Sequence, residues 1–110
     1  MDEGLLSEWH DELNESCFGS ELPQATFCIG AIRGYEAPKG PYMACYYADS
    51  VGRGTIFIHP DYATDPEVVK ASLAHEMIHQ WQDLCGLRLD HRAVFQAWCA
   101  HITEITGLVP

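Results

Sequence analysis

The sequence has clear signals for the beginning and the end of one long helix. Residues 64–67 read Thr-Asp-Pro-Glu. Thr64 or Asp65 can accept hydrogen bonds from the first free amides of a helix, and Pro66 suits its first turn. Gly86 is the residue type that commonly follows the last helical turn. The sequence therefore predicts a helix that runs from about residue 66 to Leu84, against which the rest of the chain must pack.

The middle of this helix carries an HExxH motif, because residues 75–79 read His-Glu-Met-Ile-His. Residues four apart lie on one face of a helix, so the imidazoles of His75 and His79 can reach the same point. Neutral imidazoles bind Zn²⁺ at about 2.0–2.1 Å. Glu76 can take a proton from a water held by the ion without binding the ion itself. The motif predicts one catalytic zinc ion; two solvated histidines on a surface helix are the alternative.

A catalytic zinc takes three protein ligands, and the candidates for the third are Cys85, His91, His101 and Glu104. Cys85 lies where a metzincin has its third histidine, but Gln82 replaces the glycine that such a turn requires. Glu104 occupies an ordinary solvated helix position, and His101 is more typical of a structural histidine. His91 follows a short turn that can fold the last helix back across the long one. We therefore favour His91.

The remaining elements follow from hydrophobic periodicity and from breaks rich in Gly, Pro and Asp. The pattern predicts a helix over 5–17, strands over 25–29, 42–47 and 55–58, and a last helix that begins after Asp90 as N-cap and ends at Gly107. We expect one domain over residues 1–110. Its predicted class is α+β: a helix, a three-stranded antiparallel meander and two helices, with HExxH on the second helix.

Net charge, apolar runs and cysteine content indicate which partners and which compartment to expect. The chain has 110 residues and a formal charge of -10, which disfavours direct binding to nucleic acid or anionic membranes. No apolar run approaches the ~18 residues of a membrane span. The start at Met1 lacks a signal-peptide pattern, and the five cysteines include no CxxC pair. We expect a monomer with reduced thiols in the cytoplasm, or inside the host cell if the source is viral.

Four short segments, taken in order, resemble SprT-like zinc metalloproteases, the domain type of bacterial SprT and eukaryotic Spartan. Residues 13–23 are similar to the family's opening LN…F…LP pattern, and residues 73–79 are close to its L-x-HEMIH. Residues 56–60 resemble its strand ending in Asn-Pro, with His59 in place of Asn. Residues 91–95 resemble HGxxF, with Arg92 in place of Gly. The resemblance covers most of the chain, although the family's zinc ribbon does not occur in these residues.

This resemblance implies a zincin-like fold with His75, His79 and His91 as zinc ligands and Glu76 as the catalytic acid/base. It also implies that Thr55, Ile56, Phe57 and Ile58 form the edge strand of a cleft, along which a substrate peptide lies as an added strand. Recruitment to DNA is not implied, because no DNA-binding extension is present in this sequence.

Three further residues lie close enough in sequence to contribute. Asp83 could orient a ligand imidazole or be a solvated helix acid. His59 and Tyr62 could donate hydrogen bonds to a developing oxyanion, although packing or a turn role is the ordinary expectation for each.

Together these features predict a zinc-dependent metalloendopeptidase that acts on protein or peptide substrates. The alternatives are a non-catalytic SprT-like zinc module that binds another protein, and a zinc hydrolase acting on a non-peptide amide. Glu76 argues against the non-catalytic module, because a purely structural zinc site does not need it.

Overall fold

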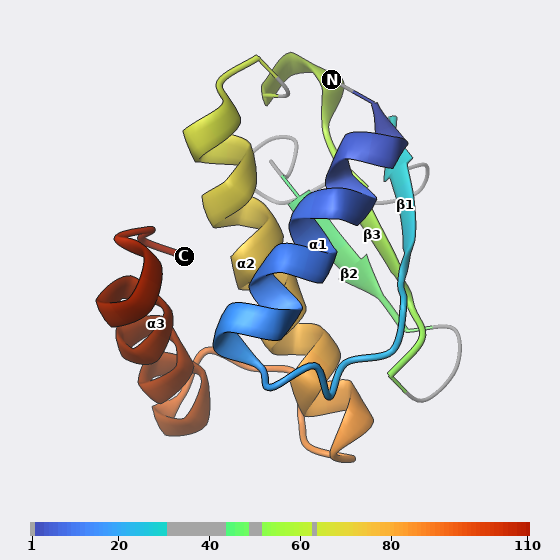
Figure 1. Cartoon of the computed structure of the whole chain (residues 1–110). Coiled ribbons are helices and arrows are strands. Elements are labelled where there is room, and N and C mark those ends of the chain that lie inside the picture. The colour runs from blue at the N-terminus through green and yellow to red at the C-terminus, as the bar shows by residue number, and fades with distance from the viewer. Residues whose placement is uncertain (1, 31–43, 49–51, 63) are drawn as a thin grey trace.

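The computed structural model describes residues 2–30, 44–48, 52–62 and 64–110 (Figure 1). Their elements are, in order, α1 (Glu3–Cys17), β1 (Thr26–Ile29), β2 (Ala44–Tyr47), β3 (Thr55–Ile58), the 3-10 helix η1 (Pro60–Tyr62), α2 (Pro66–Leu84) and α3 (Ala93–Thr106). The predicted α+β class and order of elements are confirmed. Residues 42 and 43 of the second predicted strand lie outside the described residues. No helix in these ranges is long and apolar enough to cross a membrane.

The ends of α2 follow local sequence signals. The Asp65 side chain accepts a hydrogen bond from the Glu67 amide, and Gly86 has a left-handed φ of 70°, as a residue after a helix often does. The prediction for α3 was wrong at its start, because Arg92 and not Asp90 occupies the N-cap position. The Asp90 carboxylate accepts a hydrogen bond from the Arg92 amide at 3.1 Å. It therefore stabilises the turn before the helix and not the helix itself.

The sheet is mixed, so the predicted antiparallel meander was wrong. Its strand order is β1-β3-β2; β1 pairs with β3 in parallel, and β2 pairs with β3 in antiparallel orientation. A meander requires tight connections between successive strands. Fourteen residues, 30–43, separate β1 from β2, which is far longer than a hairpin loop and leaves β1 able to pair elsewhere.

The central position of β3 overturns the predicted substrate-binding edge. Thr55, Ile56, Phe57 and Ile58 each have a partner residue in both β1 and β2. A strand that is paired on both sides has no free ladder for an added peptide. Ile56 and Ile58 are fully buried, in keeping with the central position of β3 in the sheet.

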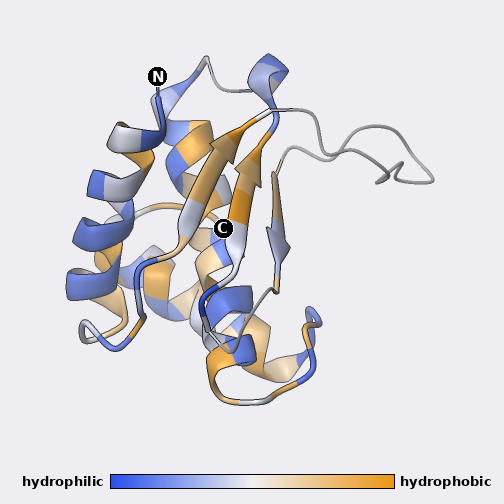
Figure 2. Cartoon of the chain, turned by 90° about the vertical axis from the view of Figure 1, so that its right-hand side faces the viewer, coloured by the Kyte–Doolittle hydropathy of each residue, from blue (hydrophilic) through white to orange (hydrophobic). Residues whose placement is uncertain are grey.

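Helices α1 and α2 cover one face of the sheet, and α3 packs beside α2 on the side away from the sheet (Figures 1 and 2). The core lies between these helices and the inward side chains of β3. Its fully buried members include Leu6, Ile56, Ile58, Leu73, Met77, Ile78 and Ile102. The turn between α2 and α3 begins at the C-terminal end of α2 and brings His91 close to two histidines of that helix.

Candidate metal centre

Three imidazoles converge at the surface of α2. His75 and His79 lie four residues apart on that helix, and the turn before α3 brings His91 to them. The Nε2 atom of His91 is 3.2 Å from that of His75 and 3.1 Å from that of His79. Among the described residues, these three form a group whose possible ligand atoms all lie within 4.8 Å of one another. The cluster could hold a metal ion.

Two separations between the nitrogens are close to those around a tetrahedral ion. Ligands at 2.0–2.1 Å from a tetrahedral centre are about 3.3–3.4 Å apart, close to the two measured separations. Each imidazole nitrogen has either one hydrogen or one lone pair. Nε2 of His91 can therefore form a good hydrogen bond with only one of its two nitrogen neighbours. A cation at the centre would satisfy all three nitrogens together.

Phe95 forms an apolar floor beneath the cluster. The centroid of its ring lies 4.7 Å from that of His75, 5.0 Å from that of His79 and 4.6 Å from that of His91. The side chain is buried and comes from the first turns of α3. Phe95 is also part of the hydrophobic core. Its contact with all three imidazoles could not be read from the sequence.

Electrostatics favours the neutral, metal-binding form of the histidines. Burial, together with repulsion from His79 and His91, lowers the pKa of His75 to about 4. Burial also lowers the pKa of His79, although the hydrogen bond to Gln82 opposes the shift. Imidazoles that resist protonation keep their lone pairs available for a cation.

Glu76 is a buried carboxyl group beside the cluster. Its Oε1 atom lies 3.9 Å from Nε2 of His75, and only 5% of the residue is exposed. Burial raises the pKa of Glu76 to about 8, and a hydrogen bond from the Tyr46 backbone opposes this shift. A carboxyl group with a raised pKa in such a position is a candidate for proton transfer.

Gln82 contacts the cluster as well, and sequence reasoning missed this. Its Oε1 atom is 2.8 Å from Nδ1 of His79, and its Nε2 atom donates to the Asp90 carbonyl at 3.2 Å. In the sequence, Gln82 stands out only as the residue in place of the glycine of a metzincin turn. Its position three residues after His79, on the same helix face, is the signal that could have found it.

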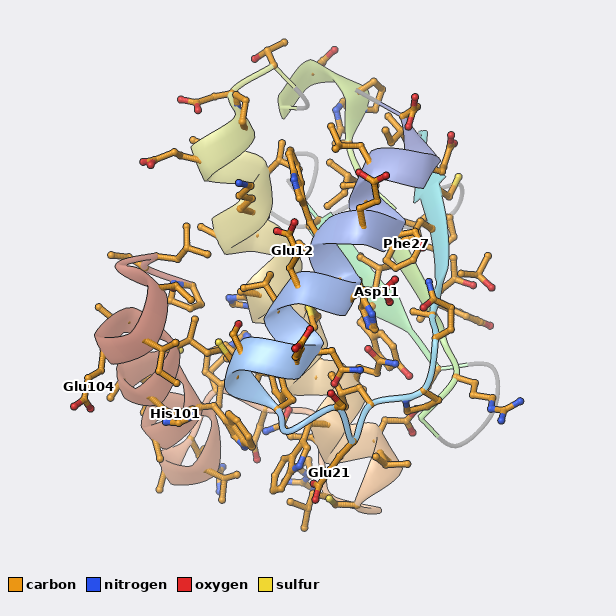
Figure 3. The ribbon with its side chains drawn as sticks, viewed as in Figure 1. Asp11, Glu12, Glu21, Phe27, His101 and Glu104 are labelled. Atoms are coloured by element: carbon orange, nitrogen blue, oxygen red, sulfur yellow. The ribbon has the colours of Figure 1, made fainter. Side chains whose placement is uncertain are left out.

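The other candidates for the third ligand lie elsewhere. Cys85 is exposed at the C-terminal end of α2. His101 Nε2 is 3.1 Å from the Cys17 carbonyl, and Glu104 points outward from α3 (Figure 3).

Asp83 and His59 are engaged in structural contacts. Asp83 Oδ2 accepts hydrogen bonds from the Tyr46 hydroxyl and the Gly52 amide, so Asp83 ties α2 to β2. His59 Nδ1 accepts a hydrogen bond from the Asp61 amide at 3.1 Å, which is a turn role. Tyr62 lies in η1, and its side chain is outside what the structure describes.

A pocket of about 450 Å³ adjoins the cluster. It is lined mainly by small and apolar side chains of α2, the start of β2 and the C-terminal segment: Ala44, Val68, Ala71, Ser72, His75, Glu76, Val109 and Pro110. One ligand candidate and the buried carboxyl group therefore share a wall with a space large enough for an apolar side chain.

Comparison of the chain with models of protein families, with curated proteins and with solved structures gave no match. The function proposed below therefore rests on the geometry of the site.

Proposed function

We propose that this chain is a zinc-dependent metalloendopeptidase of the SprT-like kind. The observation that carries the proposal is the convergence of His75, His79 and His91 Nε2 atoms next to the buried carboxyl group of Glu76. Three imidazole ligands suit zinc. A neighbouring carboxylate that is not needed as a ligand is the part that a purely structural zinc site lacks.

The residues of the site would have two roles in the reaction, metal binding and proton transfer. A bound zinc ion would polarise the scissile carbonyl and make water more acidic. The three neutral imidazoles would hold the ion, and Glu76 would accept a proton from the attacking water and donate it to the leaving amine. The burial that raises the pKa of Glu76 supports this role, because it strengthens the carboxylate as a base.

The surroundings of the cluster favour an extended peptide as the substrate. The pocket beside His75 and Glu76 has an apolar lining and can receive an apolar side chain next to the scissile bond. Ala44, at the start of β2, forms part of its wall. Because β2 is the strand of the described sheet that borders both α2 and this pocket, the peptide would run alongside β2 and not along β3.

The decisive experiment compares the zinc-loaded chain with Glu76→Gln on unfolded protein substrates and peptide libraries. Gln keeps the size of the side chain but cannot accept the proton, so we expect at least a roughly 10²-fold loss of kcat. Zinc content and thermal unfolding should stay near those of the unmodified chain. Glu104→Gln, which changes an exposed glutamate of α3, is the matched control. Equal cleavage by Glu76→Gln and the unmodified chain would refute the mechanism.

A non-catalytic module that binds a partner protein is the second candidate. It is favoured by the exposed apolar residues on and before α3, which are Leu87, Leu89, Val94 and Ile105. Chelation separates the two candidates. A structural zinc site unfolds when its metal is removed, whereas the proposed catalytic site loses activity and keeps its fold. Product analysis by mass spectrometry separates peptide cleavage from hydrolysis of a non-peptide amide.

A further inference from the structure

The side-chain amide of Gln82 can form hydrogen bonds with both of its neighbours in only one of its two orientations. The residue is 1% exposed. One end of its side chain meets the Asp90 carbonyl at 3.2 Å, and the other meets His79 Nδ1 at 2.8 Å. A backbone carbonyl can only accept a hydrogen bond, so the NH₂ group of Gln82 must face Asp90. Its oxygen must then face His79.

This orientation selects the tautomer of His79. Because the Gln82 oxygen can only accept, Nδ1 of His79 must carry the hydrogen and donate it. In the neutral imidazole the lone pair is then on Nε2. That atom lies 3.1 Å from Nε2 of His91, so the lone pair is on the nitrogen that belongs to the cluster.

The other end of Gln82 acts on His91. Asp90 immediately precedes His91, and its carbonyl is held by the Gln82 NH₂ group. Residues 87–90 have no regular secondary structure, and His91 itself is exposed. A hydrogen bond from a buried side chain of α2 therefore restrains the turn that presents His91. Gln82 therefore links the imidazole of His79 to the backbone that carries His91.

We propose that Gln82 is a positioning residue of the metal site, which sets the tautomer of His79 and anchors the turn carrying His91. Side chains that orient metal ligands typically contribute 10–100-fold to metal affinity. The inference rests on the metal binding that the proposed function includes, but it does not depend on peptide cleavage.

The test uses the full chain with Co²⁺ as the metal, because its visible absorption reports the coordination of the ion. Gln82→Leu removes both hydrogen bonds, and we expect its Co²⁺ affinity to fall 10–100-fold, with a changed absorption spectrum. Gln82→Glu keeps an acceptor for His79 but, when ionised, cannot donate to Asp90. We expect this variant to recover part of the affinity lost in Gln82→Leu.

A second measurement needs no metal. Nitrogen chemical shifts of the His79 ring distinguish its two tautomers. In the metal-free chain we expect hydrogen on Nδ1, and in Gln82→Leu a mixture of both forms. Should Gln82→Leu fail to fold, Gln82→Asn replaces it in both measurements, because its side chain is one methylene too short to span His79 and Asp90 together.

Gln80 supplies the matched control. It is also a buried glutamine of α2, but its side chain bonds to His10 and to the carbonyls of Pro23 and Gly52. Gln80→Leu should lower thermal stability and leave Co²⁺ affinity and spectrum unchanged. The inference fails if Gln82→Leu, like Gln80→Leu, lowers thermal stability but leaves the Co²⁺ affinity and spectrum unchanged. Absence of Co²⁺ binding by the unmodified chain would overturn the metal site as well, whereas absence of peptidase activity would leave Gln82 unaffected.

Discussion

The hydroxyl of Tyr46 donates a hydrogen bond to Asp83 Oδ2 at 2.6 Å, and this bond joins strand β2 to helix α2. The same hydroxyl oxygen accepts a hydrogen bond from the Gly54 amide at 3.0 Å. Asp83 Oδ2 also accepts a hydrogen bond from the Gly52 amide. Tyr46 and Asp83 therefore hold together the connection into β3, the outer strand β2 and the helix that carries the metal cluster.

Removing this hydroxyl should destabilise the fold. In Tyr46→Phe, the buried Gly54 amide loses its acceptor and Asp83 loses a donor, so we expect a loss of about 2 kcal/mol in the free energy of unfolding. Tyr47→Phe is the matched control, because Tyr47 is 56% exposed. Urea denaturation of both variants measures the difference, and equal stabilities would contradict this role of Tyr46.

Substitution of His91 should remove the metal. His91→Ala leaves two imidazoles, and we expect the bound zinc to fall from about one ion per chain to a small fraction after dialysis. His101→Ala is the control, since His101 contacts the Cys17 carbonyl and not the cluster. Elemental analysis gives the metal content. Loss of zinc from His101→Ala but not from His91→Ala would show that the third ligand is assigned incorrectly.

Filling the pocket should change substrate preference and not the chemistry. Ala71 lines the pocket beside His75, and in Ala71→Leu the larger side chain takes up space proposed for an apolar substrate residue. We expect kcat/KM for peptides with large apolar residues there to fall roughly tenfold or more relative to peptides with small ones. Mass spectrometry of a digested peptide library measures this preference. Ala100→Leu, at an exposed position of α3, is the control and should keep the substrate preference of the unmodified chain. The same preference in both variants would contradict the proposal.

Acid should weaken the fold through His10, which contacts Gln80 of α2. His10 is fully buried, and burial lowers its pKa below 6.5, although Gln80 and Asp11 oppose the shift. The unfolded state therefore binds a proton at higher pH than the folded state does. The stability that His10 contributes is complete above its unfolded pKa and is lost as pH falls through 6.5 towards its folded pKa.

A comparison with His10→Gln isolates this effect. Gln can still donate to Gln80 but does not titrate, so the variant should lose less stability than the unmodified chain between about pH 6.5 and 5. Denaturation curves across this range measure the difference. The shifts of His75 and His79 are common to both chains and cancel. Parallel stability curves would rule out His10 as the source.

Local signals in the sequence were enough to predict the three helices, apart from the start of α3, and the common helix face of His75 and His79. Asp65 and Gly86 mark the ends of α2 by hydrogen bonding and backbone conformation, which depend on a few neighbouring residues. The HExxH spacing places His75 and His79 on one face because every α-helix has the same periodicity. The position of His91 was harder to predict, since it depends on how the turn between two helices folds.

The order of the strands and the surroundings of the imidazoles depend on contacts between elements that are distant in the sequence. β1 pairs with β3 across a long stretch of chain, a choice that depends on packing and not on the residues of either strand alone. The floor made by Phe95 and the hydrogen bonds of Gln82 likewise join residues from separate elements. Periodicity tells which face of a helix a side chain occupies, but only the packed fold determines what that side chain meets.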